Sequence, residues 1–228
     1  MSTEMADKRA RRLSGALCLA VLCGFSWGVT RMTNGLENWT FEGWRQQQLA
    51  SGGLQSQPVH MLGPLVNMAS PQLWPVVSHG STAVYLVDFI YTRCPSVCRA
   101  LGSEYQQMQR GLADAPVDAG PTGSVQLVSI SFDLMQDSPA RLREYAAAVR
   151  ADPRWWTLGV PATPQDAKAL LRSLGVVVVP DGQGGFVHNG AIHLLDAQGR
   201  LRGLYEPGQW RQALTAARRL EAEQRNNR

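Results

Sequence analysis

Two short apolar runs limit the choice of fold more than any other part of the sequence. They are "AVYLVDFIY" at residues 83–91 and "SVQLVSISF" at residues 124–132. Both are nearly continuous in apolar residues, which is typical of strands that are covered on both faces. A helix is expected between them, over residues 96–112. Strands that alternate with helices in this way predict a mostly parallel sheet with helices packed against it.

The rest of the chain continues this alternation. Two helices are expected to begin where a hydroxyl residue precedes a proline, at Ser138-Pro139 and Thr163-Pro164, because the hydroxyl caps the helix and proline fits its first turn. "WWTLGV" is a candidate third strand, and "AIHLLD" and "GRLRGLY" predict an antiparallel hairpin before a C-terminal amphipathic helix. The order β-α-β-α-β-α-β-β-α predicts an α/β, thioredoxin-like fold: a central mixed sheet flanked by helices.

A stretch of 18 residues without charge, "LSGALCLAVLCGFSWGVT", lies between Arg12 and Arg31. As a helix it would be about 27 Å long, close to the thickness of the hydrocarbon core of a bilayer. Four basic residues precede it: Lys8, Arg9, Arg11 and Arg12. Since basic flanks tend to stay in the cytoplasm, we expect a single-pass protein of the inner (cytoplasmic) membrane whose C-terminal domain lies on the periplasmic side.

A cleaved signal peptide is the alternative to this transmembrane anchor. Cleavage requires small residues after the apolar run, and "SWGVTRMTNG" offers no clear site. The residues around Arg11-Arg12 fit a twin-arginine signal poorly, and the bulky Leu22 disfavours lipid attachment at Cys23. We therefore expect an uncleaved anchor, in which Cys18 and Cys23 are small apolar membrane residues.

The chain divides into four expected regions. They are a basic cytoplasmic tail over residues 1–12, the transmembrane anchor over 13–30, a linker and lead-in segment over 31–82, and the thioredoxin-like domain over 83–228. Prolines in the third region argue against a long helix there. Much of the net charge of +4 sits at the two ends of the chain, with no long basic stripe between them, and this disfavours nucleic-acid binding.

Cys94 and Cys98 are the only cysteines of the predicted exported domain. They lie between the first strand and the helix after it, the edge at which open α/β sheets place reactive groups. The helix N-terminus and the neighbouring Arg93 and Arg99 are expected to lower the pKa of both thiols. Pro95 is expected to stiffen the turn.

Three uses remain open for this cysteine pair. Three intervening residues place the sulfurs about one helical turn apart, where they can clamp a soft ion such as Cu(I) or close a redox-active disulfide. A structural disulfide is the third possibility. A zinc site would need two more close ligands, which the sequence does not supply.

A soft-metal site would favour a third ligand, and the chain has four histidines. His60 and His79 lie in the proline-rich segment and are interpreted as surface residues. His188 follows a glycine-rich loop that could fold over a site, whereas His193 is interpreted as a packing or surface residue. Residues five apart in a regular strand face opposite sides, so His188 and His193 are not expected to act together. The residues alone leave the role of His188 open.

Three blocks of the sequence resemble the SCO/SenC family of membrane-anchored copper chaperones. They are "YTRCPSVC", "SISFDLMQDSPARLREYA" and "VHNGAIHLLDAQGRLRGLY", within roughly residues 82–210. The resemblance implies that Cys94, Cys98 and His188 bind one copper ion, as Cu(I) or, as an alternative oxidation state, Cu(II). It implies that Asp133 orients the site without binding the metal, while Asp137 is expected to serve the start of the following helix.

The resemblance also implies the function and the partners. The family helps to build the dinuclear copper centre of cytochrome c oxidase, so the expected partners are a copper-accepting oxidase subunit and a thiol reductant or another copper chaperone. Ser96, Arg99 and Leu134 differ from the residues common in the family. Two alternatives use the same cysteines: a membrane-tethered thiol–disulfide reductase, and a redox or copper sensor. An enzymatic activity is not expected beyond such thiol chemistry.

Overall fold

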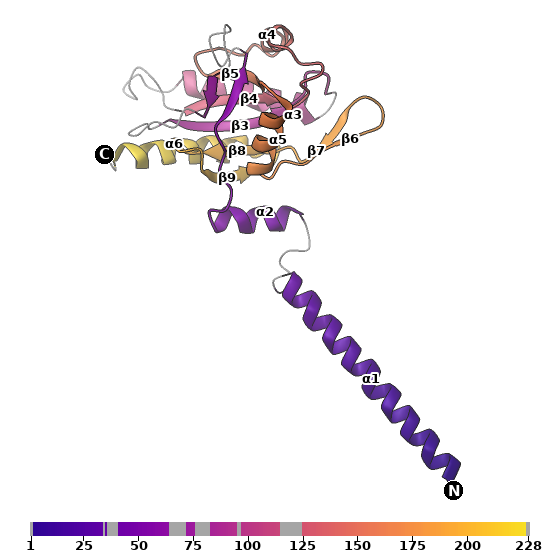
Figure 1. The fold of residues 1–228 in the computed structure, drawn as a ribbon. Helices are drawn as coiled ribbons and strands as arrows, with labels where there is room; N and C mark the ends of the chain where they lie inside the picture. Colours follow the sequence, from indigo (N-terminus) through magenta and orange to yellow (C-terminus); the bar gives the residue numbers. More distant parts are fainter. Residues whose placement is uncertain are drawn as a thin grey trace. The chain divides into compact units, whose positions relative to one another are not determined.

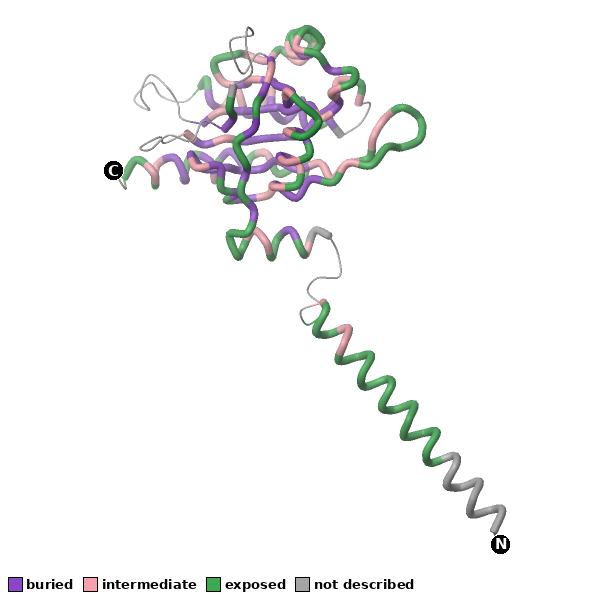
Figure 2. Tube along the Cα trace, in the orientation of Figure 1, coloured by how far each residue is buried: buried purple, intermediate pink, exposed green. Residues whose placement is uncertain are grey.

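The computed structural model describes residues 2–33, 35, 41–63, 72–75, 83–94, 97–114 and 125–226. The chain forms two units, Met1–Gln48 and Leu49–Arg228. The first contains helix α1, Ser2–Met32, and most of helix α2, Phe41–Ala50. Within α1, the segment Arg12–Met32 has a mean hydropathy of 1.7, and it is exposed except for a half-buried stretch near its end (Figure 2). By length and composition it is the one described helix that could cross a membrane.

The second unit is built on a seven-stranded mixed sheet in the order β2-β1-β5-β4-β3-β8-β9 (Figure 1). The three middle strands β5, β4 and β3 are parallel, and the strands outside them are antiparallel to their neighbours. The strands are β1 Val59–Leu62, β2 Gln72–Trp74, β3 Val84–Ile90, β4 Val125–Ser131, β5 Trp156–Pro161, β8 Ile192–Leu195 and β9 Leu201–Tyr205. The α/β alternation and the mixed sheet predicted from the sequence are confirmed.

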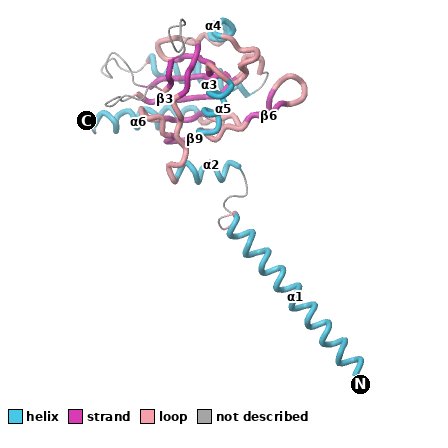
Figure 3. Tube along the Cα trace, in the orientation of Figure 1, coloured by secondary structure: helices cyan, strands magenta, loops and turns pink. Residues whose placement is uncertain are grey.

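Helices cover both faces of this sheet (Figure 3). They are α3 Val97–Ala113, α4 Pro139–Ala148, α5 Pro164–Ser173 and α6 Trp210–Asn226. Side chains of α3 and α6 pack with Leu86 and Ile90 of β3, while those of α5 pack with Val87 and Phe89 on the opposite face. Apolar cores on both faces explain why β3 and β4 are nearly continuous in apolar residues.

The two predicted helix starts are confirmed. Ser138 accepts a hydrogen bond from the backbone N–H of Arg141, and Thr163 accepts one from Asp166. A proline follows each cap within the first turn. Each hydroxyl thus satisfies a backbone donor that has no partner inside its helix.

Two parts of the sheet differ from the simplest interpretation of the sequence. Part of the expected linker and lead-in segment supplies the edge strands β1 and β2, so the compact unit begins well before residue 83. The run Val176–Val179 after α5, whose composition also suits a buried strand, stays outside the central sheet. It enters β6, Val178–Pro180, which pairs with β7, Phe186–His188, in a separate two-stranded hairpin. The hairpin expected between β8 and β9 is present.

Candidate metal and thiol site

Both cysteines lie between the end of β3 and the first turn of α3. The backbone N–H of Cys94 donates to the carbonyl of Tyr91 at 3.0 Å, which turns the chain away from the strand. Cys94 is half-buried, and Cys98 is 1% exposed. Both are free thiols in this structure. Pro95, with its expected stiffening role, lies outside the described residues.

The two cysteines are in contact, yet their surroundings differ. The backbone N–H of Cys98 points to Sγ of Cys94 at a distance of 3.4 Å. Burial raises the pKa of the Cys98 thiol, and the neighbouring Cys94 side chain raises it further. The expectation of a lowered pKa is therefore wrong for Cys98, because loss of solvent outweighs the field of the helix N-terminus.

His188 reaches the same place from the far end of the chain. Its Nε2 lies 3.7 Å from Sγ of Cys98, across 90 residues of sequence. Burial lowers the pKa of the imidazole, which favours the neutral ring that can bind a metal ion. The ring packs against Phe132, with 5.2 Å between ring centroids, and Nδ1 has no hydrogen-bond partner among the described residues.

The other histidines lie elsewhere. His193 is fully buried in β8 and packs edge-on against Phe89, 5.4 Å between centroids, which confirms its interpretation as a packing residue. His60 is on the surface, as expected, with Nδ1 4.0 Å from Asp166. His79 lies outside the described residues. His188 and His193 are separated as predicted, but for a different reason: they belong to different strands, β7 and β8.

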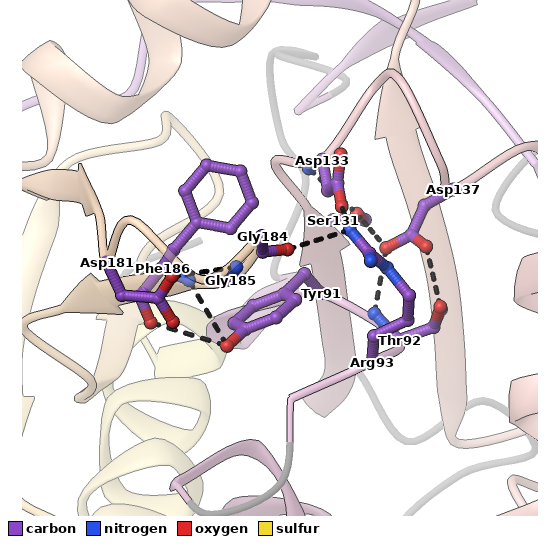
Figure 4. Close-up of polar contacts among 10 residues, drawn as sticks. All are labelled: Tyr91, Thr92, Arg93, Ser131, Asp133, Asp137, Asp181, Gly184, Gly185 and Phe186. Atoms are coloured by element: carbon purple, nitrogen blue, oxygen red, sulfur yellow. Dashed lines mark hydrogen bonds and ion pairs between the residues drawn. The ribbon is translucent and has the colours of Figure 1, made fainter.

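The loop before His188 is held in shape by Asp181 (Figure 4). Its Oδ1 accepts hydrogen bonds from the backbone N–H groups of Gln183 and Gly185, at 2.7 and 2.9 Å. Gly182 and Gly184 have φ values of +76° and +85°, a conformation that glycine adopts without strain. The glycine-rich stretch is thus a defined turn between β6 and β7.

Tyr91 connects this hairpin to the end of β3. Its hydroxyl group donates to the carbonyl of Phe186 and accepts from the backbone N–H of the same residue, both at 3.3 Å (Figure 4). The rings of Tyr91, Phe132 and Phe186 pack together with centroid distances of 5.3–5.6 Å. This cluster was not predicted from the sequence. Its only signal was the presence of aromatic residues directly after the two central strands.

Asp133 lies at the edge of the site and does not touch the cysteines through any described contact. Its carboxylate, 4% exposed, pairs with Nη2 of Arg93 at 3.1 Å. The same guanidinium group donates to the carbonyl of Gly184 at 3.2 Å. Asp133 is therefore linked to the glycine-rich turn through Arg93 (Figure 4).

Asp137 has a different role from the one expected. It was predicted to serve the start of α4, but Ser138 caps that helix. The carboxylate of Asp137 instead accepts hydrogen bonds from the backbone and hydroxyl of Thr92, at 2.8 and 2.6 Å, and from the hydroxyl of Ser131, at 2.6 Å. It fixes the turn that leads to Cys94, a contact between segments 45 residues apart that sequence spacing does not reveal.

The donor set is suited to a soft metal ion. Two thiols and a neutral imidazole match the preference of Cu(I) for sulfur and nitrogen ligands. Within the part of the chain that the structure describes, no three histidine, cysteine or acidic side chains converge closely enough to hold an ion as they stand. Cys98 nevertheless contacts both other residues, Cys94 through its backbone N–H and His188 through its sulfur.

The fold and the site together define a class: a thioredoxin-like domain with a cysteine pair at the junction of strand and helix. Solved structures share the fold. A SCO1/SenC lipoprotein from Bacillus anthracis aligns with a TM-score of 0.60 at 19% identity, over 73% of this chain and 95% of that one. Copper-bound ScoI of Bradyrhizobium japonicum aligns with a TM-score of 0.56 at 22% identity, over 73% and 99%.

Sequence comparison gives the family. The sequence model of the SCO1/SenC family matches residues 78–223. A SCO1 protein homolog of Bacillus subtilis is 25% identical over 120 residues, 52% of this chain and 59% of the relative. A second curated relative, from Stutzerimonas stutzeri, is named for copper binding. The chain spans little more than half the length of these relatives, 59% of the first and 56% of the second. The chain belongs to the SCO1/SenC family.

Proposed function

We propose that this protein is a membrane-anchored copper chaperone, which binds one copper ion through Cys94, Cys98 and His188 and delivers it to the copper centre of cytochrome c oxidase. The observation that carries the proposal is the 3.7 Å contact between Sγ of Cys98 and Nε2 of His188. Membership of the SCO1/SenC family supports it, as do relatives crystallised with copper bound and one studied as a cytochrome c oxidase assembly protein.

The ligands differ in accessibility, and this difference supports release of the metal. Cys98 is buried, whereas Cys94 and His188 are only half-buried. A ligand from a partner can therefore approach the copper ion from the side of Cys94 before the protein ligands have left. Exchange through such a shared intermediate needs no release of free copper into solution.

The same cysteines offer a redox switch. A disulfide between Cys94 and Cys98 would remove both thiolates and abolish copper binding, so a thiol reductant would be needed to restore the carrier. A relative from the same family has a described disulfide switch. Asp133 acts in this scheme through Arg93 and the glycine-rich turn, by holding His188 in place.

The test is a titration of the reduced full-length chain with Cu(I), in detergent and without oxygen. To leave only the proposed site, Cys18 and Cys23 are replaced by serine. We expect one copper ion per chain, and a loss of affinity of at least tenfold in His188→Ala, while the surface variant His60→Ala matches the parent. A stoichiometry well below one, or unchanged affinity in His188→Ala, would refute the proposal.

A thiol–disulfide reductase is the second candidate, favoured by the contact between Cys94 and Cys98. It predicts turnover of a disulfide substrate that requires both cysteines and proceeds equally well in His188→Ala. The copper chaperone predicts that His188→Ala impairs metal binding first. The same variant therefore separates the two functions.

A further inference from the structure

A groove of about 340 Å³ opens beside Cys94, between helix α3 and the end of α4. Its polar lining comes from Thr92, Cys94, Arg99, Ser103, Gln106 and Tyr145. Gly102 and Val149 contribute to its apolar part. A Cβ atom at Gly102 would lie 3.6 Å from the hydroxyl of Tyr145 and 3.8 Å from Cγ1 of Val149, so the absence of a side chain there keeps the groove open.

The groove carries a positive charge without a matching acid. Arg99 is exposed on α3 and forms no ion pair with the described residues. None of the residues that line the groove is acidic. The hydroxyls of Ser103 and Tyr145 line it as well and are further hydrogen-bonding groups. An anionic ligand in this groove would therefore contact a cation and hydroxyl groups beside an apolar surface.

The groove gives access to one sulfur and not the other. Cys94 is half-buried and forms part of the wall, whereas Cys98 is 1% exposed and does not line the groove. A nucleophile that enters here reaches Sγ of Cys94 first. The volume lies at the low end of the range for small-molecule pockets, about 300–1,000 Å³.

We propose that this groove binds a small thiol that carries a carboxylate, and that this thiol reduces a disulfide between Cys94 and Cys98. The inference rests on the redox switch of the proposed function, and it adds the site and the chemical class of the reductant. The carboxylate pairs with Arg99, and the sulfur of the ligand lies against Sγ of Cys94.

The reaction consumes two molecules of the thiol. The first loses its proton and attacks Sγ of Cys94, so that a mixed disulfide forms, the Cys94–Cys98 bond breaks and the released Cys98 sulfur takes up a proton. The second attacks the sulfur of the bound thiol, and Cys94 leaves and is protonated. Two electrons pass to the protein, and the small thiol departs as its disulfide.

The test compares reduction of the oxidised full-length chain by 3-mercaptopropionate and by the neutral 2-mercaptoethanol. Cys18 and Cys23 are replaced by serine, and freed thiols are counted by alkylation and mass spectrometry. Both reagents attack as thiolate anions, which the positive charge of Arg99 attracts, so Arg99→Gln is expected to slow both reactions. The rate of reduction by 3-mercaptopropionate should fall by a further factor of about two to five relative to that by 2-mercaptoethanol, as expected for the loss of an exposed ion pair.

Arg219→Gln is the matched control, because it removes the same charge from a side chain that is 82% exposed on α6. Equal losses for both thiols in Arg99→Gln, or the same additional loss in Arg219→Gln, would overturn the proposal. Copper stoichiometry of the reduced protein is measured in parallel. Failure of copper binding in the parent chain would refute the chaperone function and leave the thiol comparison interpretable.

Discussion

Asp88 is a carboxylic acid inside the core, on the face of β3 that α3 covers. It is 1% exposed, between Leu86 and Ile90 along the strand. Burial raises its pKa to about 7, with a smaller contribution from the carboxylate of Glu104, and the hydroxyls of Ser129 and Tyr105 act in the opposite direction. The side chain is thus largely protonated in slightly acidic solution and becomes charged, at a cost in stability, above neutral pH.

This burial predicts a pH-dependent stability. The pKa of Asp88 is higher in the folded chain than its ordinary value of 3.8, so its contribution is fully present below pH 4 and is lost as pH rises through about 7. A difference of this size corresponds to roughly 4 kcal/mol over the whole range. We expect the isosteric but uncharged Asp88→Asn to lose markedly less stability between pH 5 and pH 8 than the parent, measured by thermal unfolding of the metal-free chain in detergent.

The comparison concerns the slope and not the absolute stability, because a buried amide has its own unmet hydrogen bonds. Asp114→Asn changes an exposed carboxylate after the end of α3 and should leave the slope unchanged. If stability changed with pH in the same way in the parent and in Asp88→Asn, Asp88 would not titrate between pH 5 and pH 8. Glu104 remains in both proteins, and its effect on the pKa of Asp88 is smaller than that of burial.

At the level of single residues, the sequence predicted local chemistry better than tertiary environment. The contact between Cys98 and His188 was foreseen only through the family resemblance, since 90 residues separate the two. The burial that raises the pKa of Cys98 depends on packing beneath α3, which spacing does not report. Asp137 was assigned to its nearest helix because capping is a short-range pattern, whereas its actual partners include Thr92 in the turn after β3.

Among the elements, the hairpin of β6 and β7 matters most for the site because it carries His188. Most of its residues are half-buried or exposed, and the hydroxyl of Tyr91 is one of its anchors to the sheet. Tyr91→Phe keeps the aromatic packing but removes both hydrogen bonds to Phe186. We expect a loss of about 1 kcal/mol, faster hydrogen exchange at residues 186–188, and copper affinity reduced several-fold.

Tyr205→Phe provides the control for this hairpin prediction. It removes the same kind of hydroxyl group, but from β9, an edge strand of the central sheet that does not pair with the β6–β7 hairpin. Its exchange pattern at residues 186–188 should match that of the parent. If Tyr91→Phe left both exchange and copper affinity unchanged, the aromatic packing alone would be sufficient to hold His188.

Elements were predictable where the local sequence contains its own stop and start signals. The caps at Ser138 and Thr163, each followed by proline, fixed two helices to within a residue or two. Strands β1 and β2 have only four and three residues and lie among prolines, so no periodicity marked them. The run Val176–Val179 has the composition of a buried strand, yet only its second half forms a strand, in the β6–β7 hairpin, because the sheet positions beside β3 are taken by β4 and β8.

At the scale of the whole molecule, the arrangement proposed for the chain requires a membrane anchor with a defined direction. The helix over Arg12–Met32 has the necessary length and hydropathy. The basic residues before it outnumber those close behind it, which favours a cytoplasmic N-terminus and predicts that the domain with Cys94 and Cys98 lies on the periplasmic side. The redox proposal depends on this direction, because a disulfide between Cys94 and Cys98 persists in an oxidising compartment.

Protease protection tests the direction of insertion. In a bacterial host we expect the intact chain of 25.0 kDa in the membrane fraction, protected in whole cells and digested in spheroplasts once the outer barrier is removed. Replacing Lys8, Arg9, Arg11 and Arg12 by glutamate should shift part of the population to the protected form, because the charge difference across the helix is then inverted. Replacing Arg218 and Arg219 of α6 by glutamate changes charge outside the anchor and should leave the population unshifted.

A parent chain that resists protease in spheroplasts would place the cysteines in the cytoplasm. A mature chain shorter by the anchor would mean that the helix is a cleaved signal peptide.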